Sequence, residues 1–227
     1  MSAAAPASLA AAACAVLNAA EPDDKTGLSA AFAALWRQGA LAIGTAAPPE
    51  RPARPATPVL KPPREMPRRR AAGTLGGRIA LLHALAHIEL NAIDLAWDLI
   101  ARFTAVALPR AFYDDWVAVA AEEAQHHALL AARLEALGSV YGALPAHDGL
   151  WEAAQATAHD LLARLAIVPL VLEARGLDVT PEMIARLDAA GDDESAAALR
   201  IIYRDEIVHV RAGVRWFAYL CERQRLD

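Results

Sequence analysis

Apolar residues recur at intervals of three and four along most of the chain after residue 73, as they do on the buried faces of α-helices. In two of these segments the apolar stripe is interrupted by a Glu and, three residues later, by a His. These pairs are Glu123 with His126 and Glu206 with His209. On a helix the two side chains share one face, one turn apart. Both pairs therefore point into the predicted core, where a carboxylate without a partner is costly.

Two further helical stripes are each interrupted by a single acid, at Glu89 and at Glu173. The interval from Glu89 to Glu123 is 34 residues and that from Glu173 to Glu206 is 33, so the pattern reads as a repeated half. Two Glu-x-x-His helices with one Glu from each of two others form the dinuclear site of ferritin-like bundles. The alternative is a metal-free core in which the acids and imidazoles pair with Arg. The predicted metal ligands are Glu89, Glu123, His126, Glu173, Glu206 and His209.

Four carboxylates and two imidazoles balance the charge of two divalent cations. Such oxygen-rich ligation suits iron or manganese better than zinc. We therefore expect two Fe ions, with Mn or a mixed Mn/Fe pair as alternatives, bridged by Glu123 and Glu206. The acids that precede the two bridging residues, Glu122 and Asp205, are either hydrogen-bond partners of the metal-bound imidazoles or ordinary surface acids.

The pattern predicts an all-α protein without a sheet. A bundle over 74–227 follows a region 1–73 that holds N-terminal helices and a Pro/Arg-rich arm packed on the bundle. Ser29 is expected to cap a helix and Gly176 to end one. The extended arm from Pro48 to Pro67 continues into Arg68–Arg70. The expected helices are 7–20, 29–38, 74–103, 109–138, 148–174, a short one after Thr180, and 194–222.

Composition narrows the functional classes. The chain has 227 residues, 56% of them hydrophobic, and a net charge of −5, which disfavours general attraction to nucleic acid or anionic lipid. The arginines of the arm leave an anion or RNA contact open. No uncharged apolar run is long enough to suggest a membrane span, and the two cysteines show no disulfide or redox spacing, so a cytoplasmic protein is expected. The oligomeric state stays open.

Several longer motifs resemble a bacterial ferritin-like family of unassigned function, over most of the chain. The resemblance implies a ferritin-like four-helix bundle with a di-iron carboxylate site. The ligand plan alone is similar to that of the tRNA hydroxylase acting on methylthio-isopentenyl-adenosine, which implies oxygen activation but does not carry over a tRNA substrate. The motifs are Ala84–Leu90, Glu122–His126, Pro145–Trp151, Leu172–Asp178 with Thr180-Pro181, and Asp205–His209.

Three functions compete on these observations. The first is an oxidoreductase of the hydroxylase type that activates O₂ or peroxide, acts on a small molecule or nucleoside, and takes electrons from an external donor. It predicts a substrate pocket walled by Trp97, Trp116 or Trp216. The second is an iron-handling ferroxidase or oxidant scavenger with a small closed site. The third is a non-enzymatic scaffold that metal stabilises by binding only the folded state.

Overall fold

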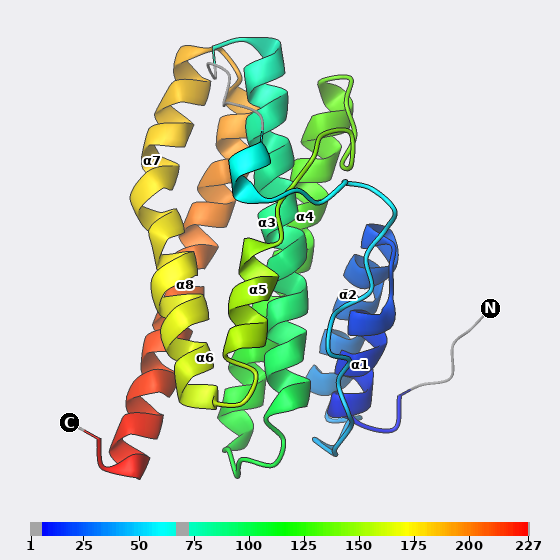
Figure 1. Cartoon of the computed structure of the whole chain (residues 1–227), viewed down its shortest axis with the longest axis vertical. Coiled ribbons are helices and arrows are strands. Elements are labelled where there is room, and N and C mark those ends of the chain that lie inside the picture. Colours follow the sequence, from blue (N-terminus) through cyan, green and yellow to red (C-terminus); the bar gives the residue numbers. More distant parts are fainter. Residues whose placement is uncertain (1–5, 67–72, 227) are drawn as a thin grey trace. The chain divides into compact units, whose positions relative to one another are not determined.

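The computed structural model describes residues 6–66 and 73–226, without the side chains of Pro63, Leu172 and Glu173. Within these ranges the chain is helical, with no strand and one isolated bridge between Leu60 and Ala146, which confirms the predicted all-α class (Figure 1). The elements are α1 Leu9–Asn18, α2 Pro22–Arg37, the 3₁₀ turn η1 Pro63–Glu65, α3 Leu75–Arg102, α4 Arg110–Ala136, α5 Gly149–Ala156, α6 Leu161–Ile167, the π-helical turn η2 Val168–Glu173, α7 Ala174–Ala189 and α8 Asp193–Gln224.

The chain divides into two compact units, and each contains one half of α3 and one half of α4. The first unit comprises Met1–Pro55 and Leu90–Gln125, and the second Ala56–Glu89 and His126–Asp227. Helices α3 and α4 continue through the division without a break. The domain boundary expected near residue 73 stays a prediction.

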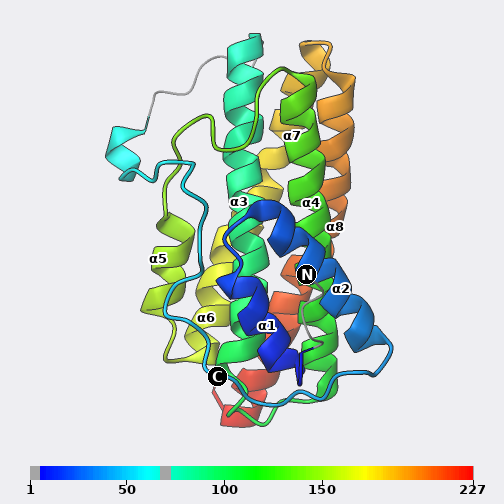
Figure 2. The same cartoon turned by 90° about the vertical axis from the view of Figure 1, so that its right-hand side faces the viewer.

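In the first unit, α1 and α2 pack against each other (Figure 2). Ser8 caps α1 by accepting a hydrogen bond from Ala11 N. The cap expected at Ser29 is wrong, because α2 already begins at Pro22, where Pro suits the first helical position and Asp23 and Asp24 favour the helix dipole. Ser29 is buried instead, and its hydroxyl accepts a 2.8 Å hydrogen bond from Trp97 Nε1.

The start of the Pro-rich arm is fastened to the first unit through buried charge. Arg54 donates to the buried carboxylate of Asp94 and to Asn91 Oδ1. Lys25, also fully buried, reaches the same carboxylate of Asp94 at 2.6 Å. The arm's arginines Arg68–Arg70 lie outside the described residues.

The second unit has a core shared by four helices, as expected for a bundle. Helix α7 packs along α8, and the two lie side by side in Figures 1 and 2. Leu187 of α7 meets residues of α3, α4 and α8 in one buried cluster. This core contains Leu82, Ala86, Leu130, Leu134, Leu187, Ala196, Leu199 and Ile202.

The single helix expected over 148–174 is wrong in two respects. It breaks between α5 and α6, where Asp160 caps α6 and the buried Arg164 donates to Ala154 O and Thr157 Oγ1 at the end of α5. It also does not stop at Gly176, because α7 runs on from Ala174 to Ala189. Packing along α8 outweighs the weak local preference of one glycine.

Helix α3 is the one described helix long and apolar enough to cross a membrane. Of the window that meets this test, 67% is buried inside the protein. A core helix has this combination as readily as a membrane span, so the length and composition of α3 do not favour a membrane.

Candidate metal centre

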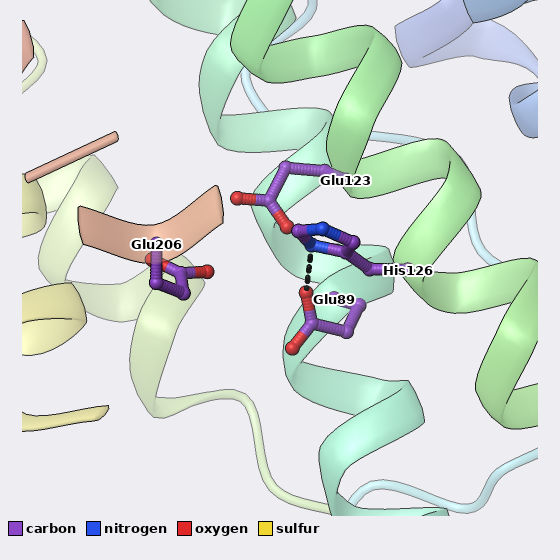
Figure 3. Close-up of side chains that lie close together, drawn as sticks. All are labelled: Glu89, Glu123, His126 and Glu206. Carbon is purple, nitrogen blue, oxygen red and sulfur yellow. Dashed lines mark ion pairs between the residues drawn. The ribbon is translucent and has the colours of Figure 1, made fainter. Parts of the chain in front are cut away.

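Four of the six predicted ligands come together. Each of Glu89 from α3, Glu123 and His126 from α4, and Glu206 from α8 offers a ligand atom, and these atoms all lie within 4.8 Å of one another (Figure 3). We call these four residues the carboxylate–imidazole cluster. Glu123 stands one turn before His126 on the unbroken helix α4, as the Glu-x-x-His spacing predicts. Glu123 is fully buried and Glu206 is the most exposed member, with 15% of its side chain accessible.

His126 sits between two carboxylates from different helices. Its Nδ1 lies 3.3 Å from Glu89 Oε2, the contact dashed in Figure 3. Its Nε2 lies 3.2 Å from Asp205 Oδ2 on α8. If Nδ1 faces a metal, Nε2 carries the proton and donates it to Asp205, the usual support for a metal-bound imidazole.

Asp205 links this imidazole to the surface. Its other oxygen, Oδ1, accepts a 2.9 Å hydrogen bond from Arg204 Nε, and the Arg204 side chain is 72% exposed. Burial acts to raise the pKa of Asp205, but the hydrogen bonds and charges of Arg204 and His126 outweigh it and hold the pKa below its usual range. Asp205 is therefore ionised at neutral pH and suited to accept the proton of His126.

His209 lies next to the cluster without belonging to the four converging groups. It is fully buried, and its ring centroid is 5.7 Å from that of His126. Its Nδ1 is 3.7 Å from Glu206 Oε1, one turn earlier on α8. The role of His209 as a metal ligand stays a prediction.

The sixth predicted ligand falls in the π-helical turn η2. The side chain of Glu173 lies outside the described residues, and its role as a ligand stays a prediction. The turn itself packs closely on α8, since a Cβ added to Gly213 would lie 2.5 Å from Pro169 Cβ. Such turns often accompany functional sites. Glu122 is half-buried on α4, and its role beside an imidazole also stays a prediction.

Two other histidines of the second unit, His83 and His87, bind a loop through hydrogen bonds. His83 Nε2 accepts hydrogen bonds from the backbone of Gly142 and Leu144, and burial lowers the pKa of His83 to about 4. His87 Nδ1 lies 2.8 Å from the Tyr141 hydroxyl, and its Nε2 lies 3.1 Å from His147 O. These contacts join α3 to the loop between α4 and α5.

His127 is a buried residue whose role carried no signal in the sequence. Its exposed fraction is 2%, and its Nδ1 donates a 2.8 Å hydrogen bond to Ala86 O on α3. Its burial, though not its role, could have been predicted from its spacing, because it lies four residues after Glu123 and three before Leu130 on one helix face. His127 thereby fixes α4 against α3 beside the cluster.

The chemistry of the donor set fits a cation. Three carboxylates with ligand oxygens within 4.8 Å of one another repel strongly in a buried setting, and a divalent ion between them removes that repulsion. Carboxylate oxygens with one imidazole suit iron or manganese better than the softer, tetrahedral sites of structural zinc. The cluster could therefore hold a metal ion.

Within the described residues the protein is all-helical and has a buried group of acids and a histidine that could hold a metal ion. The chain belongs to a family described as a protein of unknown function (DUF455), which matches residues 18–227. It is 46% identical over 178 residues to an uncharacterized protein of Haemophilus influenzae, a match covering 76% of this chain and 62% of that protein. The chain thus spans less than two thirds of this relative's length. No solved structure matches it.

Proposed function

We propose that the chain is a ferritin-like carboxylate protein with two iron ions that activates O₂ or peroxide to oxidise a substrate. The observation that carries the proposal is the convergence of Glu89, Glu123, His126 and Glu206 within 4.8 Å. The repeated spacing that places Glu173 and His209 in the second half supports a pair of ions rather than one. A bound iron pair supplies the electrons that reduce O₂ or peroxide.

The chain's own residues hold and orient this centre. Glu123 and Glu206 would hold both ions, and Glu89 and Glu173 would each hold one ion together with His126 or His209. Asp205 keeps His126 turned toward the ions by accepting its Nε2 proton. Burial of Glu123 and His209, both fully inaccessible, keeps bulk water away from the inner side of the site.

The surface hollow found in the described part of the chain is formed by residues other than the cluster. It has a volume of about 590 Å³ and is lined by Glu135, Gly138, Ser139, Val140 and Ala143. Trp97, expected as a possible pocket wall, instead donates to Ser29 of α2 in the first unit. The closed setting of Glu123 and His126 favours, as the second candidate, an iron-handling ferroxidase or oxidant scavenger.

The test is metal analysis of protein prepared without oxygen, followed by O₂ exposure and optical spectroscopy. Two irons per chain that oxidise together support the proposal, and a stable native protein with no metal argues for a scaffold. Glu123→Ala should lose the metal and all oxidation chemistry. Glu135→Ala, an exposed acid on the same helix, is the matched control and should keep both.

A further inference from the structure

We propose that the solvent-facing side of α8 binds an acidic electron-donor protein that reduces the metal centre. This inference rests on the proposed function, because a hydroxylase of this type needs external electrons. Helix α8 is the orange-to-red helix in Figure 1. The face in question, which we call the α8 outer face, consists of Arg204, Ile207, Val208, Arg211, Val214, Arg215 and Ala218, all of them exposed.

Helix α8 carries apolar residues on two opposite sides, which one core does not require. Its inner side, with His209, Gly213 and Trp216, is buried against the second unit. Its outer face exposes Val208 at 53% and Val214 at 49% of their surfaces. Exposed apolar side chains on one helix face, set among charged ones, favour a protein contact.

The charge of the α8 outer face favours an acidic partner. Three arginines, Arg204, Arg211 and Arg215, line it on a protein whose net charge is −5. A local positive surface on an acidic protein steers acidic partners to one place and orients them. A second copy of the chain is disfavoured, because docking α8 on α8 would set arginines against arginines.

Nucleic acid fits this surface less well than protein. The α8 outer face has aliphatic side chains between its arginines and no aromatic ring on which a base could stack. Ile207, Val208 and Val214 gain nothing from phosphates, but they can be buried against the apolar centre of a protein interface. An acidic protein with an apolar patch satisfies both features.

The same face is connected to the metal ligands through hydrogen bonds. Arg204 Nε donates to Asp205 Oδ1 at 2.9 Å, and Asp205 Oδ2 lies 3.2 Å from His126 Nε2. Glu206 and His209 project from the opposite side of the same helix, whose diameter is about 10 Å with side chains. A donor on the outer face is thus separated from the site by the thickness of one helix. Hydroxylation of one C–H bond by O₂ consumes two electrons and two protons and releases one water, so a one-electron donor binds twice per turnover.

The experiment uses the full chain and a plant-type [2Fe–2S] ferredoxin as the acidic probe. Binding of fluorescently labelled oxidised ferredoxin is titrated against metal-free protein at low and high salt. With iron-loaded protein, stopped-flow spectroscopy then compares reduction by reduced ferredoxin with reduction by an uncharged hydroquinone. The test variant is R211E/R215E, which changes no proposed ligand. The control K61E/R186E makes the same charge change at two other exposed sites.

The proposal requires salt-sensitive binding that R211E/R215E weakens at least tenfold, with K61E/R186E within about twofold of the wild type. Reduction by ferredoxin should slow to a similar degree in the test variant, while reduction by the hydroquinone stays unchanged. Equal effects in both variants, no ferredoxin binding, or stronger binding of tRNA or anionic vesicles through Arg211 and Arg215 would overturn it. Failure of the chain to load iron would contradict the proposed function instead, and the titration with metal-free protein separates the two outcomes.

Discussion

Two groups of buried carboxylates differ in the charges that surround them. Asp94 in the first unit contacts two protein cations, Lys25 and Arg54. Burial raises the pKa of Asp94, and the two cations oppose that rise. In the carboxylate–imidazole cluster, three acids instead converge on one another and on His126. The first arrangement is complete without a ligand, whereas the second gathers negative charge as a cation site does. This contrast separates a structural charge cluster from a candidate metal site.

The largest effect on stability is expected when Asp94 is removed from its contacts with Lys25 and Arg54. Asp94→Ala leaves Lys25 buried with its main anionic partner gone, so we expect a loss of about 3–5 kcal/mol in the free energy of unfolding. The loss should be the same with and without metal. Urea denaturation measures it, with the exposed Asp24→Asn as control. A loss under about 1 kcal/mol would show that this cluster contributes little to stability.

Removing an acid from the carboxylate–imidazole cluster should weaken metal binding without lowering the stability of the metal-free protein. Glu123→Gln removes one of three converging negative charges, so we expect iron affinity to fall about 100-fold, equivalent to about 2.7 kcal/mol. The metal-free protein should be as stable as the wild type or more stable, because repulsion is relieved. Calorimetric titration with Fe²⁺ under anaerobic conditions and urea denaturation measure the two effects. If metal-free Glu123→Gln is strongly destabilised, the cluster is structural in the manner of Asp94.

The histidines that hold the loop predict a pH dependence unrelated to metal. Because burial lowers the pKa of His83 to about 4 from an ordinary 6.5, protons bind the unfolded chain first as the pH falls. The contribution of His83 to stability is present above pH 6.5 and is lost progressively toward pH 4. We expect this loss to be about 2 kcal/mol after allowance for solvent screening.

Urea denaturation of metal-free protein between pH 7 and pH 4 measures this dependence. His83→Gln, which keeps an acceptor for Gly142 N, should flatten the profile, whereas the exposed His159→Gln should not. An identical profile in wild type and His83→Gln would rule out His83 as the group responsible.

The smallest expected effect concerns the support of His126. Asp205→Asn keeps the shape but loses the charge that accepts the Nε2 proton, so we expect iron affinity to fall about tenfold. Stability of the metal-free protein should change little, since Asp205 is partly exposed. The exposed Asp178→Asn is the control. Unchanged affinity would place Asp205 with the ordinary surface acids.

Much of the site could be predicted because helical periodicity marks the inward side of a helix. Glu89, Glu123, His126 and Glu206 each replace an apolar residue on a buried stripe, and that local fact was enough to group them. The residue that Asp205 contacts, His126, could not be predicted with the same certainty from the sequence. It lies on α4, and contacts between helices depend on how they are aligned along each other, which no local spacing encodes.

The helix boundaries between residues 148 and 190 were predicted poorly for a related reason. Gly176 was expected to end a helix, but α7 continues through it and through Pro181. In a helix interior glycine costs about 1 kcal/mol and proline about 3 kcal/mol relative to alanine, and the packing of α7 along α8 outweighs both costs here. The break between α5 and α6 depends on a cap at Asp160 and on the buried Arg164, both of which gain their meaning only in three dimensions.

Because Gly213 has no side chain, α8 can pack directly against the Pro169 ring of η2. Any side chain at position 213 would collide with a rigid ring, so α8 would have to move away from η2. Gly213 follows His209 by one helical turn, and the displacement would reach that imidazole almost undiminished. A single added methyl group at position 213 would therefore displace His209, one of the predicted metal ligands.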